Sequence, residues 1–120
     1  YRDTLQLNLA ANQRRQHDFA TAEESLLKLV EAKPTAPDVQ SELARLYQEW
    51  GTSEGGDDGR ERLQLAIGGQ RTPHEIWGWG GIIQRLQRDA RSRSDDSLKR
   101  LLIDARYGLA KSELALARLI

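Results

Sequence analysis

Apolar side chains recur at helical spacing through most of this chain. Within residues 19–32 they fall every three or four positions, at Ala22, Leu26, Leu29 and Val30. Within residues 37–50 the same spacing returns, at Val39, Leu43, Leu46, Tyr47 and Trp50. This is the pattern of helices that each bury one face. The pattern predicts two amphipathic helices that pack against each other.

Prolines and glycines mark the ends of the predicted helices. Pro34 and Pro37 separate the first two patterns, because the residue before a proline leaves the α region and proline suits a first helical turn. Residues 51–59 hold four glycines among small polar residues, which predicts a flexible loop. Thr72-Pro73 is expected to begin a further helix. The predicted fold class is all-α, with helices over residues 3–16, 19–32, 37–50, 60–68, 73–90 and 95–119.

The first and last predicted helices differ in their apolar faces. In the first, Leu5 and Leu9 are expected to face the next helix, whereas Leu7 lies off that stripe. The last carries a stripe of 4-3 spacing formed by Leu98, Leu102, Ala105, Leu109, Ser112, Leu116 and Leu119. A second seam beside it consists of Ile103, Tyr107, Ala110, Leu114 and Ala117. A helix that is apolar on two faces needs two neighbours, so this seam is predicted to meet a further repeat or another copy. Gly108 leaves open a division of 95–119 into two helices.

A weak internal repeat supports a more specific architecture. Leu9-Ala10 recurs as Leu43-Ala44, about 34 residues later, which is the period of tetratricopeptide repeats. Leu43-Ala44-x2-Tyr47, Ala22-x3-Leu26 and Pro34 resemble successive parts of that family's motif, and Trp77-x2-Gly80-Gly81 resembles its start. Gln6 and Gln40 stand where the motif has tryptophan. The chain therefore resembles a tetratricopeptide-like protein, which implies antiparallel helical hairpins stacked as a short α-solenoid with a long C-terminal helix.

The resemblance also implies a concave wall lined by the first helix of each hairpin. Trp77 and Trp79 lie two residues apart and cannot point the same way on a helix, so we expect one of them, Trp79, to face this groove. Four arginines on the wall favour an acidic or carboxylate-bearing ligand. The residues expected to line the groove are Arg14, Arg15, Ser41, Arg45, Gln48, Gly78, Trp79, Ile82 and Arg85.

Composition limits the class of protein. Of 120 residues, 30% are charged and 6% are aromatic, which is typical of a water-exposed helical domain. The absence of cysteine excludes a disulfide framework and a thiolate nucleophile, and it leaves cytoplasmic and exported locations open. No apolar run reaches the ~18 residues of a membrane span. Because the chain begins at Tyr1, we expect residues 1–120 to be one domain of a longer protein, with any targeting segment lying outside it.

Charge is unevenly distributed although the formal net charge is zero. Residues 1–59 hold 6 basic and 11 acidic side chains, net −5, and residues 60–120 hold 12 and 7, net +5. The simpler interpretation is solvated helix faces with pairing between neighbours. The alternative is a dipole that orients a partner or stacks chains head to tail.

The sequence offers little catalytic chemistry. His17 and His74 are the only histidines and lie far apart. Asp57-Asp58-Gly59 lacks the alternating ligands of a calcium loop. No lysine-serine pair follows the glycines at 78, 80 and 81, so they do not form a phosphate loop. We therefore predict a protein that is not an enzyme, with no catalytic residue, cofactor or metal.

The predicted function is a protein-interaction or assembly scaffold that binds a peptide or helix in its groove. The alternatives are a structural repeat spacer and a homo-oligomerisation module that uses the last helix. A further possibility is nucleic-acid binding through the basic run Arg85, Arg88, Arg91 and Arg93. The neutral overall charge and the interruption of this run by Asp89 disfavour it.

Overall fold

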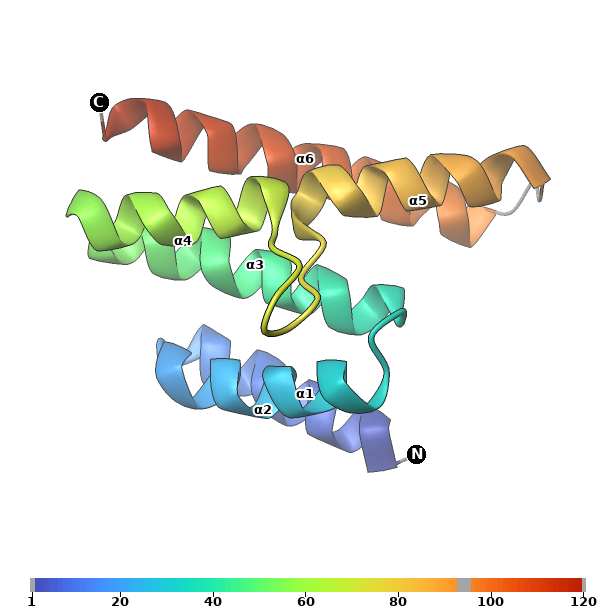
Figure 1. The fold of residues 1–120 in the computed structure, drawn as a ribbon, viewed down its shortest axis with the longest axis horizontal. Coiled ribbons are helices and arrows are strands. Elements are labelled where there is room, and N and C mark those ends of the chain that lie inside the picture. Colours follow the sequence, from blue (N-terminus) through green and yellow to red (C-terminus); the bar gives the residue numbers. More distant parts are fainter. Residues whose placement is uncertain (1, 93–95, 120) are drawn as a thin grey trace.

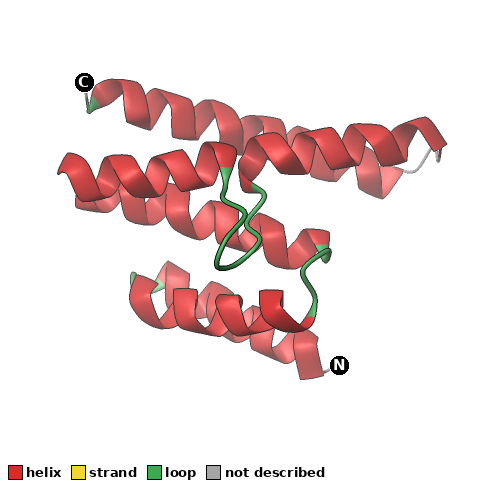
Figure 2. Ribbon diagram, viewed as in Figure 1, coloured by secondary structure: helices red, strands yellow, loops and turns green. Residues whose placement is uncertain are grey.

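The structure is a computed structural model that describes residues 2–92 and 96–119, and over these residues it is all-α (Figure 1, Figure 2). This confirms the all-α part of the prediction. The described residues contain no strand, and the nearest feature is an isolated bridge between Gln70 and Ile76. The helices are α1 (Arg2–Arg15), α2 (Phe19–Ala32), α3 (Pro37–Glu54), α4 (Gly56–Gly68), α5 (Gly78–Ser92) and α6 (Asp96–Arg118).

Helix α3 is the centre of the molecule, because it contacts every other helix. Consecutive helices pair as α1 with α2, α3 with α4 and α5 with α6. Helix α6 is the longest, and it continues past α5 to lie along α3 and α4 (Figure 1). The two ends of the chain lie at opposite sides of the molecule in this view. The hydrophobic core contains buried residues from all six helices, and within it Leu26, Leu43 and Ile82 have no exposed surface.

The first helix faces inward with a different stripe from the one predicted. Leu5 and Leu9 are each 55% exposed, whereas Ala10, Ala11 and Arg14 are buried. The two alanines let α1 approach its neighbours closely, and Arg14 reaches carboxylates on α3. The prediction that Leu5 and Leu9 face the core is therefore wrong. It failed because an arginine with buried partners cannot be distinguished from a surface arginine by periodicity.

The predicted flexible loop at 51–59 is wrong as well, because these residues complete α3 and begin α4. Only Gly55 interrupts the helices, and Gly55 and Gly56 make the turn with φ of 68° and 63°. The outer glycines allow the two helices to cross at close range. A Cβ on Gly51 would lie 2.7 Å from Leu63 Cγ, and one on Gly59 would lie 2.6 Å from the Gly51 carbonyl oxygen.

Residues 69–77 form an extended, folded-back segment instead of the start of a helix. Gln70 and Ile76 exchange two backbone hydrogen bonds of 2.8 Å, and α5 begins at Gly78 rather than at 73. The buried side chain of Gln40 holds this segment against α3. Its Nε2 donates to the Pro34 carbonyl at 3.0 Å and the Glu75 carbonyl at 2.8 Å, and its Oε1 accepts from the Trp77 N–H at 3.0 Å.

Helix α6 is continuous through Gly108, so the alternative of two helices is excluded. The predicted start at 95 lies outside the described residues. Leu98, Ala105 and Ser112 are buried, as the first stripe predicted, and Gly108 lies against the Trp79 indole. All five residues of the second seam are exposed. No neighbour within the described chain covers that seam.

Candidate functional site

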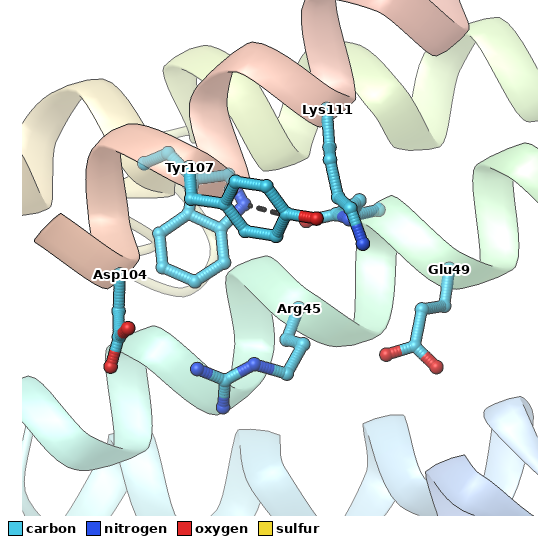
Figure 3. A pocket seen from close by; sticks show the side chains of 8 residues that line it. Arg45, Glu49, Asp104, Tyr107 and Lys111 are labelled. Carbon is cyan, nitrogen blue, oxygen red and sulfur yellow. Dashed lines mark hydrogen bonds between the residues drawn. The ribbon is translucent and has the colours of Figure 1, made fainter.

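A groove runs between α3 and α6, and we call it the α3–α6 groove. Its first part is a hollow of about 340 Å³ (Figure 3) lined by Arg45, Gln48, Glu49, Trp79, Asp104, Tyr107, Gly108 and Lys111. Its second part, of about 550 Å³, is lined by His17, Gln48, Glu49, Thr52, Ser53, Lys111, Leu114, Ala115 and Arg118. Because both parts share Gln48, Glu49 and Lys111, they form one continuous depression.

Helical periodicity places these side chains. On α3 the lining residues recur from Arg45 through Gln48 to Thr52, one turn apart, so they occupy one face. On α6, Asp104, Lys111 and Arg118 lie seven residues apart, about two turns, so they also share one face. Arg45 and Asp104 share one end of the groove, while Ser53 and Arg118 share the other. The two helices therefore run in the same direction along it.

Trp79 supports the groove from below. Its side chain is only 2% exposed, and its Nε1 donates a hydrogen bond of 3.2 Å to Gln48 Oε1. The guanidinium carbon of Arg45 lies 5.7 Å from the indole centroid. A Cβ on Gly108 would lie 2.3 Å from Trp79 Cε2, so only glycine lets the indole lie flat against α6. This contact sets the spacing of the two walls.

A buried ion-pair network fixes the α3 wall. Arg14 donates from Nε to Glu42 and from Nη1 to Glu49, each at 2.5 Å, and Arg45 lies 3.4 Å from Glu42. Burial acts to lower the pKa of Arg14, but the carboxylates of Glu42 and Glu49 outweigh it, so the pKa is raised overall. Arg14 is therefore a permanent cation that neutralises charge on Glu49 at the edge of the groove.

The remaining charges leave the groove with an excess of positive charge. Arg14 and Arg45 balance Glu42 and Glu49, so Lys111 and Arg118 are the further cations, and Asp104 is the acid that has no ion pair with a cation among the described contacts. Lys111 Nζ lies 4.6 Å from the Tyr107 ring centroid, so its charge is held over the first part of the groove, as Figure 3 shows. Tyr107 and Leu114 add apolar surface, being 62% and 54% exposed.

The structure brings only part of the predicted groove together. Arg45, Gln48 and Trp79 meet in the α3–α6 groove, although Trp79 is a buried support and not an open contact. Arg14 and Ile82 are buried. Arg85 stacks on Trp77 at 4.1 Å and lies 3.6 Å from Glu75. Arg15, Ser41 and Gly78 line neither part of the groove.

Sequence reasoning missed the entire α6 wall. The resemblance assigned the wall to the first helix of each hairpin, whereas α6 is the second helix of its pair. One signal pointed to α6: its second apolar seam. Tyr107 and Leu114 of that seam lean into the groove, while Ile103, Ala110 and Ala117 do not line it.

The other candidate residues stand apart from the groove or have structural partners. His74 Nε2 lies 2.9 Å from Glu31 Oε1, and His17 stacks on Phe19 at 5.1 Å while its backbone turns the chain. Asp57 and Asp58 lie in the first turn of α4. In the basic run, Arg88 is exposed, Arg93 lies outside the described residues, and only the backbone of Arg91 is described.

The groove offers charges, amide groups and apolar surface for binding. The described residues contain no group of three metal-ligating side chains. None of the helices in the described ranges is both long and apolar enough to cross a membrane. Comparison with protein-family models, with curated protein sequences and with solved structures found no match to this chain.

Proposed function

We propose that this chain is a non-catalytic protein-interaction module that binds an acidic peptide segment of a partner protein in the α3–α6 groove. The observation that carries the proposal is the continuity of the two hollows through Gln48, Glu49 and Lys111. A depression bounded by two long helices suits an extended peptide or a helix, which presents side chains at regular spacing along it.

The lining supports a ligand that is apolar on one side and acidic on the other. Tyr107, Leu114 and Ala115 offer apolar contact area. Arg45, Lys111 and Arg118 offer cations at successive points along the groove. Such cations act mainly on association rate and specificity, so the apolar contacts must supply much of the affinity.

The proposal includes a tetratricopeptide-like arrangement of the hairpins. Three consecutive antiparallel pairs support it, as does the central position of α3. Helix α6 departs from simple stacking, because it crosses from α5 onto α3 and α4. In this proposal the crossing closes one side of the concave wall and converts an open surface into a groove.

A selection experiment tests the proposal. A library of displayed random peptides is selected on the wild-type chain and counter-selected on Arg45→Glu/Lys111→Glu. Enriched peptides should carry several Asp or Glu residues beside apolar residues. Their affinity, measured by fluorescence anisotropy at two salt concentrations, should fall at least about tenfold in the double variant and should weaken with salt.

The matched control is Lys28→Glu, since Lys28 lies on α2 with 75% of its side chain exposed and does not line the groove. It should bind the selected peptides as the wild type does. If selection yields no peptide that distinguishes the wild type from the double variant, the groove is not the binding surface. The alternative of a structural spacer, whose wall is unused, predicts that outcome.

A further inference from the structure

Helix α6 has an apolar seam that no other part of the described chain covers. Ile103 is 64% exposed, Tyr107 62% and Leu114 54%, and Ala110 and Ala117 are exposed beside them. These five residues follow 4-3 spacing, which is the spacing of a coiled-coil seam. The buried stripe of α6, from Leu98 through Ala105 to Ser112, lies on the opposite side of the helix. The seam is thus a second, regularly spaced packing surface.

We propose that this seam pairs with the same seam of a second copy of the chain, with the two α6 helices antiparallel. In this arrangement Ile103 packs against Leu114 of the second copy, and Tyr107 packs against Ala110 of the second copy. Each contact occurs twice, because a two-fold axis relates the copies. Between residues 103 and 114, branched residues then face each other and the large Tyr107 faces the small Ala110.

The charges that flank the seam are complementary to those of a second copy, and they favour an antiparallel orientation of the two α6 helices. On one flank lie Asp104 and Lys111, and on the other lie Arg106 and Glu113, all exposed. Antiparallel pairing places each flank against its own copy, so that Asp104 meets Lys111 of the second copy and Arg106 meets Glu113 of the second copy. All four resulting pairs are attractive. In a parallel pair, Arg106 would instead meet Lys111 of the second copy and repel it.

This self-association uses a surface that overlaps the one proposed for peptide binding only in part. Ile103, Arg106, Ala110 and Glu113 do not line the α3–α6 groove. Asp104, Tyr107, Lys111 and Leu114 belong to both surfaces. Variants at Ile103, Arg106 and Glu113 therefore test the pairing without touching the residues that test peptide binding.

The first test is the solution mass of the chain, measured by light scattering and sedimentation over a wide range of concentration. The mass should rise from that of a 13.6 kDa monomer towards twice that value. Ile103→Asp should keep the chain monomeric, with the helical circular-dichroism spectrum unchanged because the side chain is exposed. Arg106→Glu and Glu113→Arg should each weaken the dimer by about tenfold, since two attractive pairs become repulsive.

The double variant Arg106→Glu/Glu113→Arg should restore wild-type dimerisation, because it re-forms both pairs with their signs exchanged. The absence of cysteine allows a second test by oxidative cross-linking. Ile103→Cys mixed with Leu114→Cys should give a covalent heterodimer in preference to either homodimer. Lys28→Glu, outside the seam, should leave the mass unchanged.

Three results would overturn the proposal. One is a mass that stays at the monomer value at every concentration. Another is a double variant Arg106→Glu/Glu113→Arg that dimerises as weakly as the two single variants. A third is efficient cross-linking of Ile103→Cys to itself, which indicates parallel helices. Each result leaves the peptide-binding proposal standing, because that test depends on Arg45 and Lys111.

Discussion

Gln40 is a buried amide whose donor and acceptor atoms join α3 to two backbone segments, the turn at Pro34 and the segment 69–77. It binds the carbonyls of Pro34 and Glu75 and the N–H of Trp77. Gln40→Leu keeps roughly the same volume but leaves these backbone groups unpaired in the interior. We expect the free energy of unfolding in urea to fall by about 2–4 kcal/mol.

The control for Gln40→Leu is Gln64→Leu, because Gln64 is exposed on α4. Its free energy of unfolding should stay within about 0.5 kcal/mol of the wild type. Equal, small effects for both variants would mean that water replaces the bonds of Gln40 and that the segment 69–77 is held by other contacts.

Tyr47 is expected to make the folded state less stable at alkaline pH. Burial, and then the charge of Glu23, which accepts the phenol hydrogen bond at 2.8 Å, raises the pKa of Tyr47. Above pH ~10 the unfolded chain therefore loses this proton while the folded chain keeps it. The free energy of unfolding should fall as pH rises beyond that value.

In Tyr47→Phe this part of the fall in the free energy of unfolding at high pH should disappear. The variant should be less stable than the wild type at neutral pH, because it lacks the hydrogen bond to Glu23. Urea unfolding between pH 8 and 11 measures both effects. Tyr107→Phe, which removes an exposed hydroxyl, is the control and should keep the wild-type slope. A Tyr47→Phe slope equal to that of the wild type would show that Tyr47 does not cause the loss.

Among elements, the contact of α6 with α5 depends on Gly108. Its missing side chain leaves room for the Trp79 indole, whose nearest ring atoms lie between 2.3 and 2.7 Å from the position of a Cβ. Because of this clash, Gly108→Ala should lower the free energy of unfolding by about 1–3 kcal/mol, although alanine favours helix formation. Gly68→Ala is the matched control, because no atom lies within 4 Å of its Cβ position.

A double-mutant cycle locates the cost of Gly108→Ala at the indole. In a Trp79→Phe background the smaller ring leaves space, so the alanine should cost clearly less than in the wild type. Chemical denaturation of the four variants measures the difference. If Gly108→Ala destabilises both backgrounds equally, the strain lies in the backbone of α6 instead.

The elements also show which parts of the fold the sequence could predict. Periodicity predicted α2 with the bounds observed, and proline chemistry placed the start of α3 at Pro37. The glycines at 51–59 misled because glycine serves two purposes. Local rules read them as flexible or helix-breaking, whereas Gly51, Gly59 and Gly108 provide close approach between helices that are distant in sequence.

The candidate site was harder to predict than the helices. Arg45 and Gln48 were expected in the groove because the tetratricopeptide resemblance assigned its wall to the first helix of each hairpin, and α3 is such a helix. Lys111 and Asp104 join them only because α6 crosses onto α3, and that crossing is a tertiary contact that no local pattern records. Arg14 was misplaced for the same reason, since its partners Glu42 and Glu49 lie on another helix.

At the scale of the whole molecule, α1 is tied to α3 through charge as much as through apolar contact. Arg14→Met keeps the aliphatic length but leaves Glu42 buried without its closest partner. Native-state hydrogen exchange of α1 amides should then report an opening free energy lower by about 3 kcal/mol. Amides of α5 should change little, because this helix has no contact with α1.

Removing both buried charges, in Arg14→Met/Glu42→Leu, should recover most of the lost protection in α1. Uniform loss of protection across all helices in Arg14→Met would instead show that the chain opens as one unit. The comparison therefore tests whether the first hairpin can open while the remaining helices stay folded.

The parallel course of α3 and α6 gives the groove a polarity. Each helix carries a partial positive charge at its N-terminus and a partial negative charge at its C-terminus. Both walls run from the end near Arg45 and Asp104 to the end near Ser53 and Arg118, so their dipoles add. A helical ligand lies at lower energy when it points the opposite way, so the groove distinguishes the two directions of an otherwise identical segment.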